Sequence, residues 1–162
     1  MTQEKIKILF VCLGNICRSP SAEAVMKKIV QDAGYENRFF IDSAGIAAYH
    51  KGELADSRMK LCADFRGYKL TSRSRPVETN DFYNFDLIIG MDDNNIRDLE
   101  RKAPDAESLA KIHRMTEYAQ KLSYDHVPDP YYGGATGFTL VIDILEDACQ
   151  GLINTIFSSQ DN

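Results

Sequence analysis

Short apolar runs alternate with amphipathic stretches along the chain, and the N-terminus shows this most clearly. Residues 5–11 form a run rich in β-branched and aromatic side chains, which is typical of a strand buried on both faces of a parallel sheet. Apolar residues then recur at the spacing of an amphipathic helix, at Ala22, Val25, Met26, Ile29 and Val30. Ser19 or a neighbour suits the start of this helix, Pro20 its first turn, and Gly34 its end. The pattern predicts a strand, a loop over residues 12–19, and a helix.

The same alternation continues to the C-terminus. Further strands are predicted at 38–42, 85–89 and 111–115, and further helices at 56–66, 92–101 and 138–156. Residues 123–137 are predicted to form a loop, because prolines, glycines and tyrosines gather there. Strands that alternate with helices predict an α/β fold in a single domain over residues 1–162, with a small parallel sheet of about four strands and helices on both faces. Ligands bind beyond the carboxyl ends of such strands, so chemistry is expected at residues 12–19.

Composition excludes several classes of protein. Apolar residues make up 44% of the 162 residues and charged residues 27%, as in ordinary globular proteins. The net charge of -5 argues against general affinity for nucleic acid. No segment approaches the ~20 apolar residues that span a bilayer, and the N-terminus lacks the features of a signal peptide. The four cysteines show neither disulfide-scaffold nor zinc spacing, which predicts a metal-free protein of the cytoplasm with reduced thiols.

The predicted loop after the first strand, CLGNICRS, combines residues suited to phosphate binding. A short loop that runs into a helix start presents backbone N–H groups and the positive end of the helix dipole to one point. Gly14 and Asn15 tolerate the tight backbone turns, and Arg18 offers a planar fork for two oxygens of an oxyanion. Ser19 can donate a hydrogen bond to a thiolate at Cys12. A cysteine alone at a strand end is more often a small core residue, but this combination predicts a nucleophile that needs no metal or cofactor.

A cysteine nucleophile also requires a proton donor for the leaving group. Asp129 is the candidate, because Pro128 and Pro130 stiffen the backbone on both sides of it. A carboxylic acid in this role typically contributes ~10²–10⁴-fold in rate, and after ionisation it can activate the attacking water. Taken alone, an aspartate in this setting is more often a turn residue than a catalytic acid.

Two segments resemble known signatures. VCLGNICRSPSAE near the N-terminus and DPYYGG near the C-terminus, with DSAG at 42–45 and FDLIIGMDDNNIRDL at 85–99, resemble low-molecular-weight protein tyrosine phosphatases over essentially the whole chain. The resemblance implies hydrolysis of phosphotyrosine and small aryl phosphates through a phosphocysteine on Cys12, with Arg18 as phosphate ligand and Asp129 as general acid. It implies a phosphotyrosine-containing protein or peptide as substrate, inorganic phosphate as product, and a monomer or weak self-association.

The resemblance also implies roles for residues around this centre. Asn15 and Ser43 are expected to support the loop through hydrogen bonds, and Asp92 to lie near the general acid. Ser72 departs from the family pattern, since many members have there a histidine that helps to hold the loop asparagine. The expected pocket and substrate cleft are lined by Leu13, Ile16, Tyr49, Tyr131 and Tyr132.

Cys17 shares the loop with Cys12. By resemblance, an oxidant could join the two sulfurs reversibly and protect Cys12 from over-oxidation. A small apolar side chain that faces the core is an equal alternative for Cys17.

Three other functions fit parts of the pattern. An arsenate reductase on the same scaffold needs further cysteines to relay a disulfide, whereas Cys62 and Cys149 stand singly in predicted helices. A phosphoarginine phosphatase resembles this loop but has Thr in place of Ile16. A non-catalytic phosphotyrosine-binding module would have no use for a thiolate at Cys12.

Overall fold

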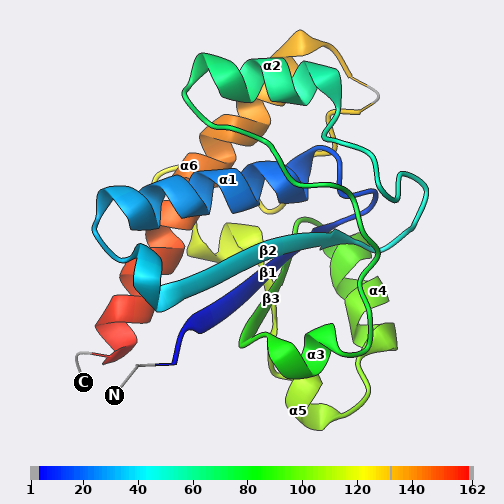
Figure 1. The fold of residues 1–162 in the computed structure, drawn as a ribbon, viewed down its shortest axis with the longest axis vertical. Helices are drawn as coiled ribbons and strands as arrows, with labels where there is room; N and C mark the ends of the chain where they lie inside the picture. Colours follow the sequence, from blue (N-terminus) through cyan, green and yellow to red (C-terminus); the bar gives the residue numbers. More distant parts are fainter. Residues whose placement is uncertain (1–3, 132, 161–162) are drawn as a thin grey trace.

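The apolar run at the N-terminus forms the central strand β1 (Ile6–Cys12) of the sheet. It pairs in parallel with β2 (Phe39–Gly45) on one side and with β3 (Leu87–Gly90) on the other, and β4 (Ile112–Arg114) pairs with β3. This computed structural model describes residues 4–131 and 133–160 (Figure 1). The prediction of a four-stranded parallel sheet is confirmed, with strand order β2-β1-β3-β4.

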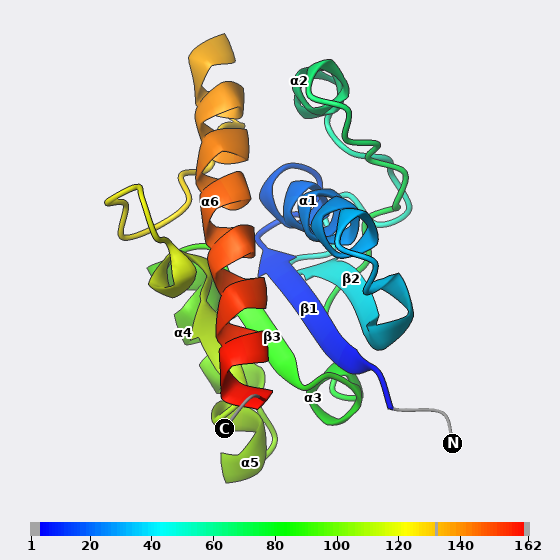
Figure 2. The ribbon, with the colours of Figure 1, turned by 90° about the vertical axis from the view of Figure 1, so that its left-hand side faces the viewer.

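Helices cover both faces of the sheet, as predicted (Figure 2). Successive side chains of a strand point to opposite faces, so Ile8 and Phe10 join one core cluster while Leu9 and Val11 join another. The first cluster packs under α1 (Arg18–Asp32) and α6 (Ala135–Gln160), and the second under α3 (Asp81–Asn84) and α4 (Asp93–Lys102). All four of these β1 side chains are fully buried, which explains the continuous apolar run.

The other elements are short. They are α2 (Ser57–Phe65), α5 (Ala106–Leu109) and the 3-10 turns η1 (Glu36–Arg38) and η2 (Met115–Tyr118). The sequence pattern predicted α2 but not α5 or the two 3-10 turns, since elements of three or four residues have no readable periodicity. Helix α6 begins at Ala135 rather than at 138. The sequence pattern did not predict the first turn because that turn contains Gly137, and glycine is a weak helix former.

The carboxyl ends of the strands meet at one edge of the sheet. Cys12 pairs with Gly45 in register, and the Cys12 carbonyl accepts a hydrogen bond of 2.9 Å from the Ile46 N–H. The segment before α6 joins the same edge, where the Val127 N–H donates to the Met91 carbonyl at 2.8 Å. Loops far apart in sequence therefore surround the end of β1. Among the described residues no helix is long and apolar enough to cross a membrane.

One glycine of α6 is required by close packing. A Cβ at Gly151 would lie 1.8 Å from the Tyr118 carbonyl oxygen of η2, whereas a Cβ at Gly137 would make an ordinary 3.6 Å contact with Pro130. We expect Gly151→Ala to lower the free energy of unfolding by about 3 kcal/mol or more, because one backbone segment must move. Gly137→Ala is the control and is expected to be neutral or stabilising by up to about 1 kcal/mol. Urea unfolding of both variants checks this, and equal stabilities would contradict it.

Candidate active site

The Cys12 sulfur lies at the point where β1 ends and α1 begins. The Cys12 Sγ is 3.0 Å from the Ser19 Oγ and 3.4 Å from the Ser19 backbone nitrogen, in the first turn of α1. Cys12 is 3% exposed. Helix α1 begins at Arg18, so Ser19 lies inside its first turn. The Ser19 hydroxyl contacts the Cys12 sulfur and does not cap the helix. A sulfur that receives donors at a helix N-terminus is placed where negative charge is favoured.

Asn15 fixes the loop in the shape that makes this contact. Its φ is 58°, and it is the one described non-glycine residue with a positive φ. Its side-chain amide donates to the Ser19 Oγ at 2.7 Å, so the Ser19 hydroxyl proton is left for another acceptor. The Cys12 Sγ at 3.0 Å is the nearer acceptor, and the Ala44 carbonyl at 3.4 Å is the farther one. The left-handed backbone expected at Asn15 is confirmed.

Two residues that the sequence pattern did not single out hold the loop from outside. The buried Ser74 hydroxyl donates to the Gly14 carbonyl at 2.9 Å, and the Arg75 N–H donates to the Asn15 Oδ1 at 3.1 Å. The Arg75 guanidinium is itself fixed by an ion pair of 3.0 Å with Asp81. Asn15 is therefore supported by the backbone of Arg75.

Arg18 is buried among acidic groups. Its side chain is 2% exposed, and its Nη1 donates to the Asp92 Oδ2 at 2.6 Å and to the Val127 carbonyl at 3.0 Å. Its Nη2 lies 3.4 Å from the Asp129 Oδ2. Burial acts to lower the pKa of Arg18, but the negative charges of Cys12, Asp92 and Asp129 outweigh it and raise that pKa. The guanidinium therefore remains charged beside the loop.

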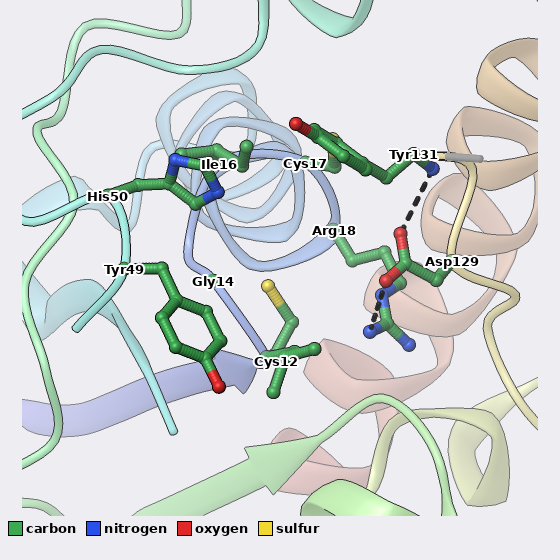
Figure 3. A pocket seen from close by; sticks show the side chains of 10 residues that line it. Cys12, Gly14, Ile16, Cys17, Arg18, Tyr49, His50, Asp129 and Tyr131 are labelled. Atoms are coloured by element: carbon green, nitrogen blue, oxygen red, sulfur yellow. Dashed lines mark hydrogen bonds and ion pairs between the residues drawn. The ribbon is translucent and has the colours of Figure 1, made fainter. Parts of the chain in front are cut away.

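Asp129 reaches the site from the segment before α6. The Tyr131 N–H donates to its Oδ1 at 3.0 Å, and its Oδ2 faces Arg18 (Figure 3). The Asp129 side chain is 33% exposed, so its carboxyl group is open to water as well as to the cavity. Arg18 bridges Asp92 and Asp129, which agrees with the expectation that these two residues lie close together.

A small cavity opens over the Cys12 sulfur (Figure 3). Its volume of about 80 Å³ is below the ~300–1,000 Å³ of pockets for drug-sized ligands, so it suits a small group such as one phosphoryl. Tyr49 is 79% exposed at the rim, and the His50 ring lies 6.1 Å from the Tyr131 ring, centroid to centroid. The cavity is lined by Cys12, Leu13, Gly14, Ile16, Cys17, Arg18, Tyr49, His50, Asp129 and Tyr131.

Cys17 differs from Cys12 in its surroundings. Burial and the nearby charge of Asp56 raise the pKa of Cys17 far above its usual range, so it remains a neutral thiol. Both cysteines are free here, and each is 3% exposed. In the described part of the chain, no group of three or more His, Cys, Asp and Glu side chains is arranged to hold a metal ion.

The Ser43 hydroxyl forms its hydrogen bond with α1. It donates to the Glu23 Oε1 at 2.6 Å, and Glu23 is buried on α1. Ser43 thus joins β2 to α1, and the contacts to the loop come from Ser74 and Arg75. Tyr132 lies outside the described residues.

His50, Ser74 and Arg75 are the residues of this site that sequence reasoning did not assign. The His50 ring packs closely against Gly14, where a Cβ would lie 3.0 Å from the His50 Cδ2. The sequence spacing of these three residues does not predict their contacts with the loop of residues 12–19. Those contacts form only because residues 46–77 fold around that loop.

The comparisons with known proteins agree on one family. The family model described as low molecular weight phosphotyrosine protein phosphatase matches residues 7–161. A low molecular weight phosphotyrosine protein phosphatase of Schizosaccharomyces pombe is 43% identical over 154 residues, which are 94% of this chain and 98% of that protein.

Two solved structures extend the comparison. A protein tyrosine phosphatase of Entamoeba histolytica, crystallised with Hepes in its active site, is 49% identical with a TM-score of 0.94, over 96% of this chain and 99% of that one. A Drosophila arginine phosphatase is 30% identical with a TM-score of 0.87, over 93% of this chain and 98% of that one.

The positive φ of Asn15 leads to a stability prediction. Asn15→Gly and Asn15→Ala both remove the hydrogen bonds to Ser19 and Arg75, but only alanine also strains a left-handed backbone. We expect both variants to be less stable than the wild type, and Asn15→Ala to be less stable than Asn15→Gly by about 1 kcal/mol. Urea unfolding measures both, and an alanine variant as stable as the glycine variant would show that the strain is absent.

Proposed function

This chain belongs to the low molecular weight phosphotyrosine protein phosphatase family, and we propose that it hydrolyses phosphotyrosine in proteins by passing the phosphoryl group through Cys12. The family membership makes it a phosphoric monoester hydrolase. One observation carries the proposed mechanism: the Cys12 sulfur forms the floor of a phosphate-sized cavity, with Arg18 and Asp129 in the walls of the same cavity.

In the first step, the Cys12 thiolate attacks phosphorus from the floor of the cavity. The S–P bond forms as the bond from phosphorus to the phenolic oxygen breaks, and Asp129 gives its proton to that oxygen. The tyrosine side chain leaves as a neutral phenol. Ser19 stabilises the thiolate, and the N–H groups of residues 13–18 together with Arg18 bind the three phosphoryl oxygens.

In the second step, water attacks the phosphocysteine. The ionised Asp129 accepts the water proton, the S–P bond breaks, and inorganic phosphate and the Cys12 thiolate are released. The two steps return every group to its starting state, so no cofactor or metal ion is consumed. The raised pKa of Arg18 supports this scheme, because the guanidinium stays positive beside an anionic group in both steps.

The walls of the cavity favour an aryl phosphate. The Tyr131 and Tyr49 side chains stand above the cavity, where a phenyl ring can pack while its phosphate reaches Cys12. A shorter phosphoserine would gain less apolar contact at that depth. Leu13, 41% exposed at the mouth, and Ile16 inside it add apolar surface.

The two rival activities find less support. A structural neighbour is an arginine phosphatase, but here the cavity has the apolar Ile16 in the position where such enzymes are expected to have Thr. An arsenate reductase needs a cysteine relay, yet Cys149 is fully buried with a pKa raised by that burial, and the Cys62 Sγ lies 3.5 Å from the Thr139 Oγ1 on α6. Neither cysteine lines the cavity.

The nucleophile is tested with a panel of substrates. We expect the wild type to release phosphate from a phosphotyrosine peptide much faster than from phosphoserine or phosphoarginine peptides, and not to reduce arsenate. Cys12→Ser should abolish turnover while it still binds phosphate, because an alcohol at this site is not ionised. Preference for phosphoarginine would overturn the substrate assignment, and turnover by Cys12→Ser would overturn the mechanism.

The acid is tested with Asp129→Asn. This change keeps an oxygen acceptor for the Tyr131 N–H but removes the transferable proton. We expect kcat/KM for an aryl phosphate with a poor leaving group to fall by ~10²–10⁴-fold. Inhibition by inorganic phosphate should be unchanged or tighter, since a negative charge beside the anion site is lost. Near wild-type turnover of phenyl phosphate by the variant would exclude Asp129 as the acid.

A further inference from the structure

We propose that Arg58 is a positioning residue that holds the general-acid segment (residues 127–131, which include Asp129) at a fixed distance from the phosphate loop (residues 12–19). This inference rests on the proposed role of Asp129. Arg58 does not line the cavity. Its proposed function is to fix the position of the Asp129 carboxyl group relative to Cys12.

Arg58 is anchored to the phosphate loop through Asp56. The Asp56 N–H donates to the Ile16 carbonyl at 2.8 Å, which ties the start of α2 to the loop. The Asp56 carboxylate caps α2 and accepts from the Arg58 Nε at 3.2 Å and from the Arg58 Nη2 at 3.0 Å. Burial acts to raise the pKa of Asp56, but its hydrogen bonds with Arg58 and the Met59 N–H lower that pKa, so the pair is ionic.

The other contacts of Arg58 are with Tyr131 in the general-acid segment and with Phe138 of α6. Its Nη2 donates to the Tyr131 carbonyl at 3.1 Å, and its guanidinium carbon lies 5.4 Å from the Tyr131 ring centroid. A second ring, that of Phe138 at the start of α6, lies 4.9 Å from the same atom. The Tyr131 N–H in turn donates to the Asp129 Oδ1. Arg58 therefore fixes Tyr131, and Tyr131 fixes the Asp129 carboxyl group.

The path from the nucleophile side to the acid side is continuous. It runs from the Ile16 carbonyl through Asp56 and Arg58 to Tyr131 and Asp129, and each link is 3.2 Å or shorter. Arg18 also links the two sides, but its 3.0 Å bond reaches the Val127 carbonyl at the start of the segment, whereas its Nη2 lies 3.4 Å from the Asp129 Oδ2. Loss of the Arg58 bond to the Tyr131 carbonyl therefore releases the end of the segment that carries Asp129 and Tyr131.

Displacement of a general acid has a specific kinetic signature. Proton donation matters most when the leaving group is a strong base and least when it is a weak one. A misplaced Asp129 should therefore slow phenyl phosphate far more than p-nitrophenyl phosphate. A displacement of ~1 Å can cost up to ~10²-fold. General weakening of the fold would instead reduce both rates in the same proportion.

The experiment compares Arg58→Met with Arg66→Met in the full chain. Methionine keeps an unbranched apolar stem against the two rings but removes the charge and the donors. Arg66 follows α2 and is the matched control, because its ion pairs of 2.6 Å with Asp143 and 2.7 Å with Glu146 also join α2 to α6 but do not reach the acid segment.

We expect Arg58→Met to lower kcat/KM for phenyl phosphate by about 10- to 100-fold and that for p-nitrophenyl phosphate several-fold less, with inhibition by inorganic phosphate unchanged. Arg66→Met should leave both rates near wild type. In an Asp129→Asn background, Arg58→Met should cause little further loss, since it acts through a proton donor that is already absent.

Several outcomes would overturn the proposal. Equal losses on both substrates, or a loss that is fully additive with Asp129→Asn, would show that Arg58 only stabilises the fold. If Asp129→Asn alone showed no dependence on the leaving group, the acid assignment itself would fail and the proposal with it. Loss of phosphate inhibition in Arg58→Met would instead mean that the phosphate loop has been disturbed.

Discussion

The site depends on one constraint: the start of α1 must point its donors at a sulfur at the end of β1. From Ile8 to Cys12 the central strand is buried on both faces, so the position of Cys12 is set by the whole sheet. The left-handed turn at Asn15 then brings Ser19 within 3.0 Å of the sulfur. In the proposed mechanism, phosphate binding and activation of the nucleophile therefore both follow from this local geometry.

The charge balance around Arg18 follows from this arrangement. A buried guanidinium in a protein of net charge -5 is costly unless it is paired, and Asp92 and the Val127 carbonyl supply the pairing. These partners fix the direction of the side chain before any anion enters. In the proposed function, the charge that binds the substrate is therefore already in place in the fold, and a phosphoryl group can enter with little rearrangement.

Much of this could be predicted from the sequence. The strands, the long helices and the grouping of Cys12, Asn15 and Arg18 in one loop between strand and helix could be predicted because each depends on neighbours in sequence or on a regular period. The support of the loop by Ser74 and Arg75, and the link through Arg58, could not be predicted, because these contacts join segments that only tertiary packing brings together. Ser43 illustrates the same limit: its hydroxyl contacts Glu23 on α1, and sequence spacing says nothing about which of two nearby elements a side chain will face.

The nucleophile and the acid also differ in how firmly the fold holds them. Cys12 ends the central strand, and the amides of such a strand exchange with solvent only when the whole molecule opens. Asp129 lies in a partly exposed segment between the 3-10 turn η2 and α6, and hydrogen bonds from Arg18 and Arg58 attach this segment to the rest of the protein. Such segments open locally at a small fraction of the global free energy. If Asp129 is the acid, as proposed, mild heat or denaturant should therefore abolish its proton donation well before it unfolds the anion site. The protein would then pass through a state that binds phosphate but turns over slowly.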